Sequence, residues 1–370
     1  MKRNRILIIG PARGHNIQPF LDFFQSQMEY EATLLHGGKN EFDTKKYSNI
    51  KFVEDKKRIR KIRLYYSILR KKETPNLIWY HGGYNSYLLF LIWLIKSSQT
   101  PINLNIWGEK VPNQVVKKGF RGWVYKFVFG RVEHIHCNWI STYNIMKSIK
   151  TKDLFIQPWG IEKRYINYEV SKCISEKASV FIKTIPSDKI CFFVPKSIIK
   201  PVRHDLIIKA VKRLGIEGHN NFVVYFWLGE TNDPSLLSEY KKFIDKNNLQ
   251  TIKTVKHNYI PYNDLIMIWN KMDAGIMLVN NDQLSVTFLE TMLFKKELIA
   301  SNILPYKYYN EKFNTELNLV NLDTDSVYNA MKKYIDGYKS NSEILDRRSN
   351  IVKEHFCFEK NIKKVLKRLL

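Results

Sequence analysis

A short segment in the second half of the chain combines two carboxylates with the start of a predicted helix. Asp282 and Glu290 flank the residues Gln283, Leu284, Ser285 and Val286, after which the sequence becomes apolar and helical. Backbone amides at a helix start attract phosphate groups, and a carboxylate further along the helix can accept hydrogen bonds from ribose hydroxyls. Glu290 is hard to explain structurally because unpaired carboxylates are seldom buried. Asp282 could instead simply cap the helix.

A glycine turn near the amino terminus is a second, weaker signal. Gly10-Pro11-Ala12-Arg13-Gly14-His15 follows an apolar run and precedes a helical one, where a turn lets amides approach a phosphate. It lacks the three-glycine spacing of a dinucleotide fingerprint, and it could be only a tight turn. The chain has no P-loop lysine motif, zincin helix or Gly-x-Ser-x-Gly elbow, which excludes several enzyme classes.

These residues must be positioned by an α/β fold, because short apolar runs alternate with helical stretches along the whole chain. Such runs lack period-two alternation, which is typical of parallel strands covered on both faces. Strands are expected in the first half at 5–9, 32–36, 77–80 and 103–107, and in the second at 189–194, 222–228, 250–255, 274–279 and 298–300.

The length of 370 residues favours two domains, since single cores stop growing well below this size. The pattern resets after Gln157-Pro158-Trp159-Gly160, which places the boundary there. We therefore expect two Rossmann-like doubly wound domains, 1–157 and 158–357, facing a central cleft at the carboxyl ends of their strands. The basic helix expected at 358–370 could lie back across the first domain.

Several loose motifs in consistent order resemble the family 4 retaining glycosyltransferases, which have the GT-B fold. Asp282 to Glu290 resembles the E-x7-E signature, with aspartate replacing the first glutamate. The resemblance extends over most of the chain through Asn76 to His81, Trp107-Gly108-Glu109, Ile156 to Ile161, Met272 to Leu278 and Ala300-Ser301-Asn302.

The resemblance implies a role for each candidate residue. Glu290 would bind the nucleotide ribose, and Asp282 with the amides of residues 283–286 would hold the donor sugar and diphosphate. Lys196 occupies the position of the first diphosphate cation, and either Lys200 or Arg203 supplies the second. His81 would lie beside the reacting sugar and acceptor, with Gly14 near the donor phosphates. Each of the cations could instead be a surface charge, and His81 an ordinary loop histidine.

The same resemblance implies transfer of a sugar from a nucleotide-diphosphate donor with retention of configuration. No Asp-x-Asp pair stands out in a plausible metal-binding loop, so we expect transfer without a metal or other cofactor, assisted by fixed cations and helix-start amides. The expected acceptor is lipid-linked or a saccharide, in synthesis of a bacterial capsule, lipopolysaccharide O-antigen or related surface polysaccharide.

The formal net charge of +25 points to a polyanionic partner. Basic residues cluster at 56–72 and 117–121, and the first cluster is interleaved with apolar residues, which is typical of a helix on an anionic membrane surface. We expect a cytoplasmic protein at the inner face of the membrane. The alternative is a non-enzymatic binder of RNA or anionic lipid, although no recognised nucleic-acid motif is present. The positive charge could also serve a diphosphate substrate, or most lysines could be solvated surface charges. The four cysteines form no CxxC pair.

Overall fold

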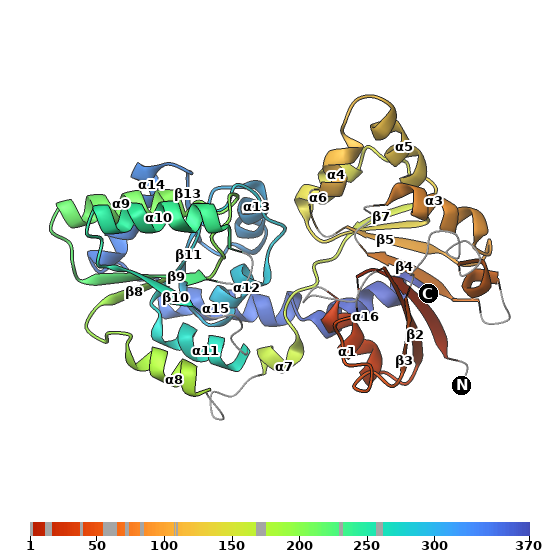
Figure 1. The fold of residues 1–370 in the computed structure, drawn as a ribbon, viewed down its shortest axis with the longest axis horizontal. Coiled ribbons are helices and arrows are strands. Elements are labelled where there is room, and N and C mark those ends of the chain that lie inside the picture. The colour runs from red at the N-terminus through yellow and green to blue at the C-terminus, as the bar shows by residue number, and fades with distance from the viewer. Residues whose placement is uncertain are drawn as a thin grey trace. The chain divides into compact units, whose positions relative to one another are not determined.

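The computed structural model describes residues 3–11, 17–37, 40–54, 65–70, 74–81, 85–106, 108, 110–167, 175–228, 232–256 and 262–370. The chain divides into two compact units, residues 1–162 with 358–370, and residues 163–357. Figure 1 shows that each unit consists of a sheet covered by helices. Each unit is built around one parallel sheet, so the predicted pair of doubly wound sheets is confirmed.

The first unit contains a seven-stranded sheet in the order β3-β2-β1-β4-β5-β6-β7. Its elements are β1 (Asn4–Ile9), α1 (Gln18–Ser26), β2 (Tyr30–His36), β3 (Ile50–Glu54), β4 (Leu77–His81), α3 (Ser86–Ile95), β5 (Ile102–Ile106), α4 (Lys110–Val115), α5 (Phe120–Phe129), β6 (His134–Cys137), α6 (Ile140–Met146), β7 (Asp153–Ile156) and α16 (Phe358–Leu369). Strand order reverses between β1 and β4, where open α/β sheets bind ligands.

The second unit contains a six-stranded sheet in the order β10-β9-β8-β11-β12-β13. Its elements are α7 (Lys163–Ile166), α8 (Glu176–Lys183), β8 (Ile190–Val194), α9 (His204–Ile216), β9 (Phe222–Leu228), α10 (Pro234–Lys246), β10 (Ile252–Lys256), α11 (Tyr262–Lys271), β11 (Ala274–Met277), α12 (Val286–Leu293), β12 (Glu297–Ser301), α13 (Leu304–Phe313), β13 (Asn318–Val320), α14 (Thr324–Ile335) and α15 (Ser342–His355). The order reverses between β8 and β11.

Alternating side chains of each strand enter two cores. In the second unit, Phe192 of β8 packs with residues of α9 and α14, whereas Phe193, the next residue, packs with residues of α8 and α11. Because both faces of the sheet are covered, the strands read as continuous apolar runs.

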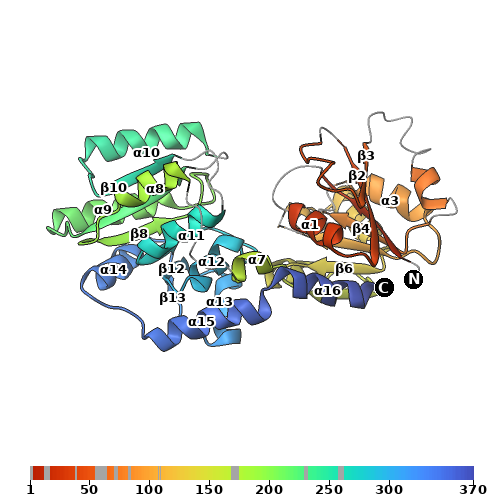
Figure 2. The ribbon, with the colours of Figure 1, turned by 90° about the horizontal axis from the view of Figure 1, so that it is seen from below.

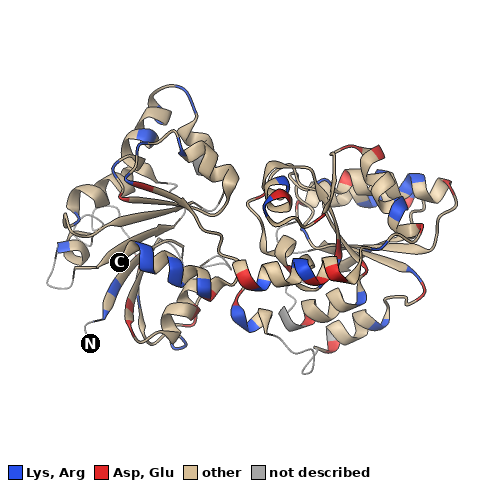
Figure 3. Cartoon of the chain, turned by 180° about the vertical axis from the view of Figure 1, so that it is seen from behind, with Lys and Arg blue, Asp and Glu red and all other residues tan. Residues whose placement is uncertain are grey.

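Helix α16 returns to the first unit and covers one face of its sheet (Figure 2). Its buried side chains, Phe358, Ile362, Val365, Leu366 and Leu369, share a core with α1 and β1. The exposed basic residues of α16 are Lys360, Lys363, Lys364, Lys367 and Arg368. Figure 3 shows the blue of Lys and Arg along this helix, near the carboxyl terminus.

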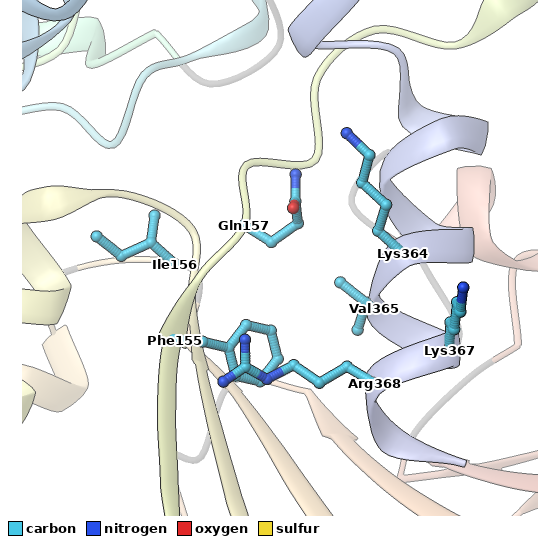
Figure 4. Close-up of a pocket in the computed structure, with 7 residues that line it drawn as sticks. All are labelled: Phe155, Ile156, Gln157, Lys364, Val365, Lys367 and Arg368. Atoms are coloured by element: carbon cyan, nitrogen blue, oxygen red, sulfur yellow. The ribbon is translucent and has the colours of Figure 1, made fainter.

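A hollow of about 310 Å³ lies between α16 and the edge strand β7 (Figure 4). Arg368 closes one end of it, because its guanidinium lies 4.4 Å from the ring centre of Phe155 and donates to Asp153 at 2.8 Å. The basic side chains Lys364 and Lys367 also line it. These contacts attach the last helical turn to the sheet edge.

Candidate active site

The loops that follow β8 and β11 are joined at the carboxyl edge of the second sheet. The amide of Arg203 donates to Leu278 O at 2.8 Å, and the amide of Asn280 donates to Pro201 O at 2.9 Å. Val202 and Val279 form an antiparallel bridge between these two hydrogen bonds. The pairing holds the loop containing Lys196, Lys200 and Arg203 beside the one leading to Asp282, at the point where strand order reverses.

Glu290 is a buried carboxyl on α12. Its side chain is only 4% exposed, and its Oε2 has no hydrogen-bond partner among the residues that the structure describes. Burial raises its pKa to about 7, and the nearby positive charge of Lys196 opposes this increase. A buried carboxyl oxygen without a hydrogen-bond partner lowers the stability of the folded protein. A ligand that donates hydrogen bonds to this oxygen would therefore stabilise the fold.

The three candidate cations occupy different environments. Lys196 is half-buried just after β8 and acts electrostatically on Glu290. Lys200 is exposed. Arg203 is bound to Asp205 through two hydrogen bonds of 2.8 Å, from Nε and Nη2, and this pairing raises the pKa of Arg203. The charge of Lys196 therefore acts on Glu290, whereas Arg203 has a carboxylate partner of its own.

Asp282 organises the loop before α12. It accepts hydrogen bonds from the amides of Gln283 (2.9 Å) and Ser285 (3.1 Å), and from the hydroxyl of Tyr306 (2.5 Å) on α13. Burial, reinforced by the charge of Asp282, raises the pKa of Tyr306 well above its usual range, so the phenol remains a donor. Leu284, within this loop, has a φ of 60°. These contacts fix a left-handed turn directly ahead of the helix.

The first turn of α12 presents backbone amides. Ser285 is the N-cap and its side chain makes no capping hydrogen bond. The amides of Gln283 and Ser285 are already donated to Asp282. Of the four predicted phosphate-binding amides, those of Leu284 and Val286 are not used by Asp282, and the amide of Thr287 adds another because a helix's first amides lack partners within it. This geometry suits an anion.

His81 ends β4 in the first unit, beside the end of β1. A Cβ on Gly10 would lie 3.2 Å from the Cβ of His81, so a side chain at position 10 would require His81 to shift by a few tenths of an ångström. Asn105 Nδ2 lies 3.2 Å from His81 Nδ1, and the ring of Phe20 packs edge-on at 4.8 Å. Burial, and secondarily His136, lower the pKa of His81 to about 3. The imidazole is therefore neutral, and Asn105 as donor places its proton on Nε2.

In each unit, residues that were not predicted from the sequence support a candidate site residue. His81, Asn105 and His136 are in register across β4, β5 and β6, and His136 Nε2 donates to Gln157 O at 2.6 Å. Their signal in the sequence is polar residues within apolar strands, as in Ile102-Asn103-Leu104-Asn105-Ile106. Tyr306 carried no such signal, because its contact with Asp282 depends on tertiary structure.

Some predicted features lie outside the described residues: Gly14, Trp107, Glu109 and the basic residues at 56–63 and 71–72. Cys137, Cys191 and Cys357 are buried and are not in disulfide bonds. In the described ranges, no group of three or more His, Cys, Asp or Glu residues could hold a metal ion. None of the helices formed by the described residues is long and apolar enough to cross a bilayer.

Solved structures similar to this chain share both of its sheets. A glycosyltransferase from Rickettsia africae matches with a TM-score of 0.81 and 14% identity, over 100% of this chain and 98% of that one. The Anabaena protein Alr3699/HepE, in complex with UDP, matches at 0.76 and 10%, over 99% of each chain. The chain has the GT-B fold. Sucrose-phosphate synthase from Thermosynechococcus elongatus has it as well, matching at 0.74 with 11% identity over 99% of each chain.

At these identities the GT-B fold is the conclusion, since one fold can carry different activities. No protein-family model matches the sequence, and no curated protein sequence matches it either. The assignment of an activity therefore rests on the residues of the site.

Proposed function

We propose that this protein is a glycosyltransferase that takes its sugar from a nucleotide-diphosphate donor bound to the second unit. The observation that carries the proposal is the buried carboxyl of Glu290, whose Oε2 is unpartnered among the described residues. The positive charge of Lys196 acts on it, and it lies on the helix whose first amides are available. Similar structures have been solved with UDP and with UDP-glucose, both in Alr3699/HepE.

Each part of the donor has a matching group at this site. Glu290 accepts hydrogen bonds from the ribose hydroxyls, and Lys196 with the first amides of α12 binds the diphosphate. Asp282 keeps the preceding loop in shape through its contacts to Tyr306 and the loop amides. Of the two remaining cations, Lys200 is the better second ligand for the diphosphate because Arg203 is already paired with Asp205.

In the proposed reaction the bond between the anomeric carbon and the diphosphate oxygen breaks, and a bond from that carbon to an acceptor hydroxyl oxygen forms. The hydroxyl proton passes to the departing diphosphate, which leaves from the same face, so configuration is retained. Lys196 and the helix-start amides stabilise the charge that grows on the diphosphate, without a metal. His81, held neutral in the first unit, donates a hydrogen bond from Nε2 to a sugar or acceptor oxygen.

We further propose a lipid-linked or saccharide acceptor, in the synthesis of a bacterial surface polysaccharide at the inner face of the membrane. The formal net charge of +25 supports this location, because a strongly basic protein is attracted to an anionic membrane surface.

The test is a thermal-shift screen with UDP, GDP, dTDP, CMP and their sugars on wild type and Glu290→Gln. A ligand that binds only the native state raises the melting temperature. Loss of hydrogen bonds to a charged acceptor costs about 1.5–3 kcal/mol, so Glu290→Gln should weaken the preferred nucleotide about ten- to a hundredfold. Glu311→Gln, an exposed acid on α13, is the matched control and should bind like wild type.

Transfer is then measured with the selected donor as hydrolysis to nucleoside diphosphate and as product formed on lipid or saccharide acceptors. A folded wild-type protein that is stabilised by none of these nucleotides, but by a polynucleotide with steep salt dependence, would overturn the proposal in favour of a polyanion binder.

A further inference from the structure

Two helices of the first unit expose a row of large apolar side chains. On α3, Tyr87, Phe90 and Leu94 follow at helical spacing, and on α5 the residues Phe120, Trp123 and Phe127 do the same. We call these six residues the α3–α5 face. Five of them are exposed, by 74% for Tyr87, 55% for Leu94, 72% for Phe120, 58% for Trp123 and 37% for Phe127, whereas Phe90 is partly buried against the core.

The aromatic rings of this face are in contact with one another. Along α5, Phe120 and Trp123 stack with ring centres 5.9 Å apart, and Trp123 and Phe127 with centres 5.3 Å apart. Phe90 of α3 joins them through Phe127 at 5.9 Å. The two helices pack side by side on one face of the sheet (Figure 1). The result is one continuous apolar surface, which soluble surfaces seldom present without a partner.

Positive charge surrounds the α3–α5 face. From Ser97 to Val132 the sequence has a single acid, Glu109, against these cations: Lys110, Lys117, Lys118, Arg121, Lys126 and Arg131. Lys96, at the end of α3, is buried and paired with Glu133. Lys117, Lys118 and Arg121 are exposed next to Phe120 in the chain. The guanidinium of Arg131 lies 4.2 Å from the ring centre of Phe127. Exposed aromatic side chains with cations around them are typical of helices that lie in a membrane interface.

We propose that the α3–α5 face binds an anionic lipid bilayer, with Phe120 and Trp123 inserted at the boundary between headgroups and acyl chains. Lys117, Lys118 and Arg121 then contact the lipid phosphates. The proposal goes beyond the transferase activity because it uses no residue of the donor site. It also differs from the composition argument, since it depends on exposed rings and a defined pair of helices.

Two other partners fit this face less well. Single-stranded nucleic acid needs ring faces open for base stacking, whereas Trp123 already stacks on both Phe120 and Phe127. The aliphatic side chain of Leu94 suits acyl chains but offers a base nothing to stack on. A second copy of the chain would bring two like-charged surfaces together in a symmetric contact, which costs free energy.

Helix α16 supplies a matched control within the same unit. Its exposed face carries Lys360, Lys363, Lys364, Lys367 and Arg368. Its apolar residues Phe358, Ile362, Val365, Leu366 and Leu369 are all buried, and Leu370, which follows the helix, is exposed. It is therefore as basic as the α3–α5 face but has no exposed aromatic ring. Pure electrostatic attraction would use both surfaces, and interfacial insertion only one.

The experiment is flotation of the full chain with phosphatidylcholine vesicles, with and without phosphatidylglycerol. Wild type should float with the phosphatidylglycerol vesicles. Phe120→Ser/Trp123→Ser should reduce the partition coefficient at least about thirtyfold, through lost insertion of two rings. Lys117→Gln/Arg121→Gln should also reduce it roughly thirtyfold, at about 1 kcal/mol for each cation. Lys363→Gln/Lys367→Gln on α16 should change it by less than about threefold.

All substituted side chains are exposed, so unchanged melting temperatures would show that the variants fold. The proposal fails if wild type does not float, if the aromatic variant floats like wild type, or if the α16 variant loses as much as Lys117→Gln/Arg121→Gln. It also fails if Phe120→Ser/Trp123→Ser converts a dimer to a monomer without affecting flotation, because the face is then a subunit contact. Selective loss of polynucleotide binding by the same variant, with flotation intact, would assign the face to nucleic acid. Nucleotide binding, measured in parallel, reports on the donor site alone.

Discussion

The raised pKa of Glu290 predicts how stability depends on pH. Burial raises this pKa from 4.5 to about 7, so between these values the folded protein binds a proton that the unfolded chain releases. The contribution of the carboxyl to stability is complete below about pH 4.5 and is lost as the pH rises through 7. Glu290→Gln should therefore be more stable than wild type above pH 7, by up to about 3 kcal/mol, and equally stable near pH 4.

Urea unfolding of both proteins across this pH range measures the difference. Nucleotide binding should have the opposite dependence, because ribose hydroxyls donate to the ionised carboxylate, and affinity should rise with pH through about 7. A constant stability difference between Glu290→Gln and wild type over pH 4–9 would show that the pKa of Glu290 is the same in the folded protein as in the unfolded chain. If Glu290→Gln is more stable than wild type and yet binds nucleotide less well, position 290 behaves as residues of functional sites commonly do.

The tautomer of His81 gives a second prediction at the scale of one residue. Because Asn105 Nδ2 faces His81 Nδ1 at 3.2 Å, wild type should hold a single neutral tautomer with the proton on Nε2. Asn105→Ala removes the donor and should produce a mixture of tautomers. Ring nitrogen chemical shifts of labelled histidine at neutral pH distinguish the two cases. A mixture already present in wild type would rule out a positioning role for Asn105.

At the scale of elements, the loop before α12 depends on a contact from a neighbouring helix. Tyr306 on α13 donates to Asp282 at 2.5 Å, and the phenol is buried. Tyr306→Phe leaves the carboxylate with only its two loop amides, so the free energy of unfolding should fall by about 1–3 kcal/mol. Tyr308→Phe on the same helix, where the ring is partly exposed, should change it by less than about 0.5 kcal/mol.

Urea unfolding provides this comparison as well, and nucleotide affinity adds a functional measurement. If the loop positions the first amides of α12, Tyr306→Phe should also weaken nucleoside diphosphate more than nucleoside. Equal stability of the two variants would mean that the Asp282 loop keeps its shape without the phenol.

The elements that could be predicted from sequence are those with a strong local pattern. The strand Phe222–Leu228 is a continuous apolar run, and α12 begins after a polar loop, so both were identifiable. The short strand β6 was not, because His134 and His136 interrupt its apolar pattern. Likewise, Glu290 stood out as an acid on an apolar helix, whereas its proximity to Lys196 depends on the pairing of loops distant in sequence. Which cation binds Asp205 could not be read from spacing for the same reason.

At the scale of the molecule, the end of the chain returns to the first unit. The sequence suggested that a basic helix at 358–370 could lie back across the first domain, but its amphipathic pattern does not say which side chains receive the buried face. The structure places Phe358 among Phe20 and Trp159, with ring centres 5.0 and 5.9 Å away, and Asn361 Nδ2 donates to Pro158 O at 2.9 Å. The first unit is therefore made of two segments from opposite ends of the chain.

This arrangement predicts that a change in the last helix destabilises the first half of the chain. Leu366 is 1% exposed in the core that α16 shares with α1 and β1. Leu366→Ala should cost about 2–5 kcal/mol, all of it in the unit of residues 1–162 and 358–370. In calorimetry the transition of that unit should move to lower temperature, because each unit has its own core. The exposed Lys367→Ala on the same helix should leave both transitions in place. Since the proposed donor site lies wholly in residues 163–357, the nucleotide selected by the thermal-shift screen should still raise the other transition of Leu366→Ala by its wild-type amount. A loss of that shift would mean that nucleotide binding requires the first unit to be folded.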